Sequence, residues 1–218
     1  MTHAEKRVYL IRALLREDPR YREISIPADL GAQQYLLRSL LNMRPPRTAS
    51  RTFLQVQGAY LAEILAEKGI TDSDTLPQLR PGISLWQGDI TTLRADGIVN
   101  AANSSLLGCF IPCHGCIDNA IHTFAGVELR LACERLIRQQ GREEGVGQAK
   151  ITPAFHLPSR YVLHTVGAII TGRLHQSACD ELASCYRACL TLADAYRCLL
   201  YTSPITISRA SIGKNFSI

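Results

Sequence analysis

Three cysteines and a histidine lie close together in one short stretch of the chain: Cys109, Cys113, His114 and Cys116. A loop that contains glycine and proline can gather these side chains around one ion, and a mixed set of thiolate and imidazole ligands favours zinc. The apolar run just before the loop, residues 98–103, ends in polar amides. The sequence therefore predicts a metal ion beside a polar pocket at the end of a strand.

Several readings of this loop stay open from the residues alone. A closed structural site would use all four groups, whereas a catalytic site would use Cys109, His114 and Cys116 and keep one position open, with Cys113 left to pack. The cysteines could also be buried without a metal. The Pro-Cys-x-x-Cys pattern at 112–116 matches half of a zinc deaminase motif, but that chemistry needs an upstream His-x-Glu. The only histidine before the loop is His3, so we reject the deaminase.

Composition narrows the class of protein. The chain has 218 residues, of which 46% are hydrophobic, so it can bury a substantial core. No apolar run reaches the length of a membrane span, and the N-terminus lacks a signal peptide's apolar core, so we expect a cytoplasmic protein without membrane contact. The net charge of +5 is mild and dispersed, which gives no support for specific nucleic-acid binding. The remaining cysteines lie in helical patterns and are expected to be core residues: Cys133, Cys179, Cys185, Cys189 and Cys198.

The chain divides into three parts by pattern. Residues 1–80 show helical spacing of apolar residues, with one helix ending at Met43-Arg44-Pro45 and another at Gly69. Residues 81–198 alternate between expected strands (83–87, 97–102, 149–157, 161–166) and expected helices (117–139, 179–199), with a connector over 72–81. This alternation predicts an α/β sheet covered on both faces, with strand 97–102 buried on both sides and ligands beyond its carboxyl end. Residues 199–218 show no clean period, and we expect an aberrant tail, foreign sequence joined to a truncated gene.

Three segments resemble the macrodomains, which are α/β/α modules that bind ADP-ribose. They are Gly88-Asp89-Ile90-Thr91, then residues 98–108, Ile-Val-Asn-Ala-Ala-Asn-Ser-Ser-Leu-Leu-Gly, and Tyr161-Val162-Leu163-His164-Thr165-Val166-Gly167. Where most macrodomains carry a Gly-rich stretch, this chain has residues 109–122. That replacement, with the helical N-terminal region, is similar to the zinc-dependent branch of protein-ADP-ribose hydrolases, which is linked to sirtuin-type ADP-ribosyltransferases and lipoyl carrier proteins. The resemblance implies a three-layer α/β/α fold and an incomplete C-terminus, because the family's second Gly-rich phosphate loop is absent after Cys198.

The resemblance also implies roles for individual residues. Asp89 would accept a hydrogen bond from the adenine amino group, Ile90 would line the adenine slot, and Asn103 would orient the distal ribose. Zinc would be held by Cys109, His114 and Cys116. Asp118, Asn119, Ala120 and Ile121 would open a helix whose free amides favour a pyrophosphate. Each role has a simpler alternative: Asp89 could cap a turn, Asn100 could serve a loop backbone, Asp118 and His122 could form a helix-surface pair, and His164 could be a core histidine.

These roles lead to a predicted activity. The chain is expected to hydrolyse the bond between ADP-ribose and a protein aspartate or glutamate, with Asn103 holding the ribose and Asp118 as the general base. Zinc (Zn²⁺) is the expected cofactor, as a positioner first and an activator second. The partners would be ADP-ribose and an ADP-ribosylated protein, for which a lipoyl carrier is one candidate. The alternatives are a module that binds ADP-ribose without cleaving it and a structural zinc knuckle.

Overall fold

The N-terminal part of the computed structural model, which describes residues 1–170, 173 and 175–198, is a group of three helices. They are α1 (His3–Glu17), α2 (Leu30–Met43) and α3 (Arg51–Lys68). Each begins after a residue whose side chain accepts a hydrogen bond from the first turn: Thr2, Asp29 and Ser50. The helices share an apolar core that includes Leu10, Leu14, Leu37, Leu40, Phe53 and Leu61. The predicted helical region and the predicted helix end at Gly69 are both confirmed.

The central sheet has three strands among the described residues, β5 (Gly97–Ala102), β6 (Ala149–Pro153) and β7 (Tyr161–Val166). Their order is β5-β7-β6, with β5 parallel and β6 antiparallel to β7. The register places Asn100 opposite His164. The expected strands over 97–102 and 161–166 are confirmed, whereas the strand expected over 149–157 ends at Pro153.

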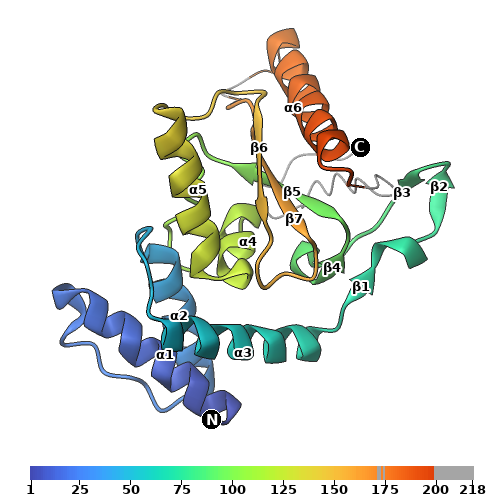
Figure 1. Ribbon diagram of the computed structural model, residues 1–218. Coiled ribbons are helices and arrows are strands. Elements are labelled where there is room, and N and C mark those ends of the chain that lie inside the picture. Colours follow the sequence, from blue (N-terminus) through green and yellow to red (C-terminus); the bar gives the residue numbers. More distant parts are fainter. Residues whose placement is uncertain (171–172, 174, 199–218) are drawn as a thin grey trace.

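Helices cover the sheet in a three-layer α/β/α arrangement, as predicted (Figure 1). Helices α4 (Ile117–Ala125) and α5 (Val127–Gln140) lie on one side of the sheet, and α6 (Gln176–Ala195) lies on the other against β6 and β7. The prediction that β5 is buried on both faces is wrong for the described residues. Ile98 and Asn100 are buried, but the alternate residues Val99 and Ala101 are not, because α6 packs mainly over the two neighbouring strands.

The amphipathic pattern over 117–139 predicted one helix, and this prediction is wrong. Two helices meet at Gly126, which has φ +90°, a conformation that side chains with a Cβ rarely adopt. A Cβ there would also lie 2.6 Å from Gln57 Nε2, on α3. The break therefore allows the chain to change direction while passing close to the N-terminal helices.

The segment between α3 and β5 forms two small pairs of strands. β1 (Thr71–Asp72) pairs in parallel with β4 (Leu93–Arg94), and β2 (Gln78–Arg80) pairs with β3 (Ile83–Ser84) in an exposed hairpin. The strand expected over 83–87 is thus only two residues long, and the connector expected over 72–81 contains paired residues. The division of the chain at residue 80, which falls in this hairpin, stays a prediction.

Two further expectations concern the ends and the surroundings of the chain. Among the described residues, no helix has both the length and the apolar character needed to span a membrane. The expected tail over 199–218 lies outside the described residues.

Candidate metal centre and nucleotide site

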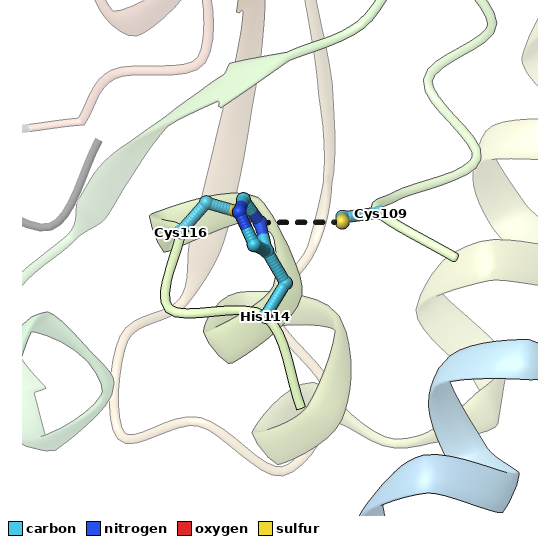
Figure 2. A group of neighbouring side chains, drawn as sticks. All are labelled: Cys109, His114 and Cys116. Carbon is cyan, nitrogen blue, oxygen red and sulfur yellow. Dashed lines mark hydrogen bonds between the residues drawn. The ribbon is translucent and has the colours of Figure 1, made fainter. Parts of the chain in front are cut away.

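The loop between β5 and α4 brings Cys109, His114 and Cys116 together. Their ligating atoms all lie within 4.8 Å of one another, and Cys109 Sγ is 3.6 Å from His114 Nδ1. Figure 2 shows Cys109 entering from one side and pointing toward His114 and Cys116, which lie near the start of α4. Burial and the neighbouring Cys109 raise the pKa of the Cys116 thiol, so Cys116 favours the neutral thiol unless a cation beside it stabilises the thiolate. The donor set therefore fits zinc.

Cys113 lies in the same loop but turns away from these three ligands. Its Sγ is 3.4 Å from Ser39 Oγ and 3.6 Å from the Tyr35 carbonyl oxygen, both on α2. Its backbone is left-handed, with φ +52°, an uncommon conformation for a residue other than glycine. This geometry favours three protein ligands over a closed set of four.

Asp118 points into the protein beneath the loop. Its carboxylate accepts a 2.8 Å hydrogen bond from Asn100 Nδ2, and His122 Nε2 lies 3.6 Å from the same oxygen. Asp118 is only 5% exposed, and burial raises the pKa of its carboxyl to about 6. Asn100 therefore holds a carboxylate rather than a loop backbone, and the Asp118–His122 pair is buried rather than on a helix surface.

A second group of side chains, His122, Cys133 and His164, lies deeper in the core and could also hold a metal ion. Its ligating atoms lie within 4.8 Å of one another. His164 Nε2 is 2.9 Å from Thr152 Oγ1, and burial lowers the pKa of His164 to about 4 and raises that of Cys133 to about 12. The group is therefore uncharged, and His164 is the hydrogen-bonded core histidine that its apolar strand predicted. Sequence spacing could not group these residues, because they come from three separate elements, α4, α5 and β7.

Asp89 and Ile90, the residues expected at the adenine, lie where α3 ends. Asp89 Oδ1 accepts a hydrogen bond from the Thr91 amide, so it caps the turn as the simpler alternative predicted. Its other oxygen accepts a 2.8 Å bond from Lys68, whose Nζ lies 3.5 Å from the centre of the Phe124 ring. Burial raises the pKa of Asp89, but the bonds from Lys68 and Thr91 outweigh it and keep that pKa below its usual value. Ile90 packs in the main core. Lys68 was not singled out from the sequence.

The remaining predicted residues are engaged in local hydrogen bonds. Asn103 donates to the Gly108 carbonyl over 3.0 Å and accepts from Ser105, so its amide shapes the turn before the loop. At the start of α4, the Asn119 amide donates to Cys116 Sγ and the Ala120 amide to the Cys116 carbonyl. The helix-end amides that precede them, at residues 117 and 118, have no acceptor within the helix. The side chain of Ile121 is fully buried.

Comparisons with known proteins agree with this architecture. A family model for the Macro domain matches residues 99–207. The chain is 53% identical over 197 residues to a protein-ADP-ribose hydrolase of Treponema medium, covering 88% of this chain and 76% of that protein. It is 48% identical over 191 residues to a protein-ADP-ribose hydrolase of Staphylococcus aureus, covering 85% and 70%.

A solved macrodomain structure is also similar to this chain. The Trypanosoma brucei macrodomain in complex with ADP-ribose is 28% identical, with a TM-score of 0.50, and the match covers 72% of this chain and 67% of that one. The family match also extends past the expected boundary at residue 198, to residue 207. Fold, sequence match and relatives agree, and the chain belongs to the macrodomain family.

Proposed function

We propose that this protein hydrolyses the bond between ADP-ribose and a modified protein, and that the bond it cleaves is the ester to an aspartate or glutamate side chain. One observation supports this most: three metal ligands converge directly before α4, whose second residue is a buried carboxylate. The relatives of about 50% identity that carry the name protein-ADP-ribose hydrolase support the same activity.

Cys109, His114 and Cys116 are the residues proposed to hold zinc. When bound, zinc would supply an electrophilic centre that orients a ribose hydroxyl or a water molecule. Two thiolate ligands cancel the charge of a divalent ion, and this weakens its power to acidify water. We therefore assign the metal loop to positioning the substrate, in preference to generating hydroxide.

The protein's own residues would carry the bond cleavage. A water oxygen attacks the anomeric carbon of the ribose, the bond from that carbon to the ester oxygen breaks, and its electron pair leaves with the carboxylate. Asp118 is our candidate to accept the proton of the attacking water, because a raised carboxyl pKa near 6 suits a base that works near neutral pH. Asn100 would hold Asp118 in place through the hydrogen bond that its side-chain amide donates.

Binding of the rest of the nucleotide is also part of the proposal. Asn103 would orient the distal ribose, and Asp89 and Ile90 would receive the adenine. The start of α4, where the amides of residues 117 and 118 have no acceptor within the helix, would face the diphosphate. Asp89 keeps its charge beside Lys68 and retains partial exposure, so it can accept a hydrogen bond from an adenine amino group. A lipoyl carrier protein stays a candidate for the modified partner.

Release of ADP-ribose from defined substrates tests this function. Proteins modified on aspartate or glutamate should be cleaved, whereas matched proteins modified on serine or arginine should not. Zinc removal with a chelator should reduce release, and added zinc should restore it. Tight binding of ADP-ribose without cleavage of any substrate would instead identify a binding module. Full activity in the zinc-free protein would reject the role of the metal loop.

A further inference from the structure

The metal loop is held by helix α2, which belongs to the N-terminal helical region far away in sequence. Four residues of α2 contact the loop. Tyr35 does so through its backbone carbonyl, and three do so through side chains that lie on one face of the helix: Arg38, Ser39 and Asn42. Ser39 and Asn42 are buried. None of these residues belongs to the proposed ligand set or to the nucleotide site.

Asn42 fixes the middle of the loop. Its Oδ1 accepts a 2.9 Å hydrogen bond from the Cys113 amide. Its Nδ2 donates to Thr123 Oγ1 over 2.9 Å, and Thr123 in turn donates to the Asn119 carbonyl on α4. Asn42 thus links the left-handed Cys113 to α4, the helix that begins directly after Cys116.

Arg38 fixes the end of the loop. Its Nη2 donates to Asn119 Oδ1 over 2.9 Å and to the His114 carbonyl over 3.3 Å. Asn119 donates through its side chain to the Ile111 carbonyl and through its backbone amide to Cys116 Sγ. The Arg38 guanidinium therefore contacts the backbone of His114 directly and is linked to the sulfur of Cys116 through Asn119.

We propose that Arg38 and Asn42 are positioning residues for the metal centre, and that helix α2 sets the affinity of the loop for zinc. This inference rests on the ligand set of the proposed function. An exposed loop with two glycines and a residue at positive φ would otherwise have many conformations in which His114 and Cys116 do not converge. Hydrogen bonds that orient metal ligands commonly change metal affinity by 10–100-fold.

The test is a zinc affinity measurement on the full chain by competition with a chromophoric chelator. Asn42→Ala and Arg38→Gln should each bind zinc about 10–100-fold more weakly than the wild type. Gln34→Ala, at an exposed position of the same helix, is the matched control and should keep wild-type affinity. Denaturant unfolding of the zinc-free proteins should show that Arg38→Gln is as stable as the control, since Arg38 is only partly buried. Arg38→Gln therefore still tests the positioning role if Asn42→Ala fails to fold.

The outcomes separate this inference from the proposed function. Wild-type affinity in folded Arg38→Gln would overturn the positioning role and leave the ligand set intact. A wild-type protein that binds no zinc would overturn both. Cobalt(II) adds an independent readout, since its thiolate charge-transfer band should persist in Gln34→Ala and weaken in the two positioning variants at equal cobalt.

Discussion

The side-chain amide of Asn100 donates a 2.8 Å hydrogen bond to Asp118 Oδ1, and this bond joins a fully buried residue to one that is 5% exposed. The two residues come from different elements, β5 and α4, so this bond joins the sheet to the helix that follows the metal loop. Burial of a carboxylate costs free energy unless hydrogen-bond donors compensate for the lost water.

Asn100→Ala should therefore lower the free energy of unfolding by about 1–3 kcal/mol, because it removes a donor from a buried carboxylate. Urea denaturation at neutral pH measures the change. The same Asn100→Ala change should cost less when it is made in Asp118→Asn, because the carboxylate is then absent. If Asn100→Ala costs the same in wild type and in Asp118→Asn, the lost side-chain volume matters and the hydrogen bond does not.

Cys113→Ser should leave zinc bound at one equivalent, whereas Cys116→Ser should lose it. The reason is that Cys113 Sγ faces Tyr35 and Ser39 on α2 while Cys116 Sγ faces the other ligands. Metal analysis of the purified proteins after gel filtration checks both variants. Loss of zinc from folded Cys113→Ser would identify a closed site with four protein ligands.

Local patterns were sufficient to predict much of this fold. Strands 97–102 and 161–166 begin and end where the apolar runs do, and α3 ends at the glycine that the sequence marked. These features depend on neighbours along the chain. The grouping of Cys109, His114 and Cys116 was predictable for the same reason, since a short loop limits how far its side chains can separate.

Features set by distant contacts were not predictable. The apolar pattern continues through Gly126, and the close approach of Gln57 and His156 to this glycine comes from parts of the chain far away in sequence. Arg38 and Asn119 are separated by 81 positions, and Lys68 and Asp89 by 21. Nothing in the local sequence of Arg38 or Lys68 distinguishes it from an ordinary solvated side chain.

Gly126→Ala should destabilise the protein more than Gly141→Ala. Both glycines have positive φ, but Gly141 lies in the left-handed helical region with ψ 6°, where alanine costs about 1–2 kcal/mol, whereas Gly126 has ψ 173°, a conformation almost confined to glycine, so alanine costs more there. A Cβ at Gly141 meets nothing within 4 Å, but at Gly126 it would press on Gln57, Glu128 and His156, which are hydrogen-bonded to one another. Thermal unfolding of the two variants measures the combined extra cost of the backbone conformation and of this contact at Gly126. Equal losses would show that neither the backbone conformation of Gly126 nor the three side chains around it adds to the cost.

The buried His164 should make stability fall in acid. Burial depresses the pKa of His164 from 6.5 to about 4, so the unfolded chain binds this proton more readily than the folded protein. Its contribution is complete above pH 6.5 and is lost as the pH falls toward 4, by up to about 3 kcal/mol. The opposite shift at Asp118 is present in any variant that retains Asp118, so comparison with His164→Gln cancels it.

Urea denaturation of wild type and His164→Gln between pH 7.5 and pH 4.5 measures this contribution. The wild type should lose stability relative to the variant as the pH falls, because glutamine does not titrate. A difference between the two proteins that stays constant with pH would show that His164 takes up protons as easily in the folded protein as in the unfolded chain.

Gln57 joins the N-terminal helices to the α/β layers, and its removal tests whether the two parts unfold together. Gln57 is almost fully buried on α3, where it accepts from the Val127 amide over 3.0 Å and donates to Glu128 Oε2 over 2.8 Å. Gln57→Ala leaves a buried amide without an acceptor and should cost about 1–3 kcal/mol. Gln55→Ala, exposed on the same helix, is the control and should stay within about 0.5 kcal/mol of wild type.

A single, sharper transition in wild type that splits into two in Gln57→Ala would place the cooperative link at this side chain. Identical unfolding curves for the two variants would show that the apolar contacts of Phe124 and Val127 with the helical core carry the link without it.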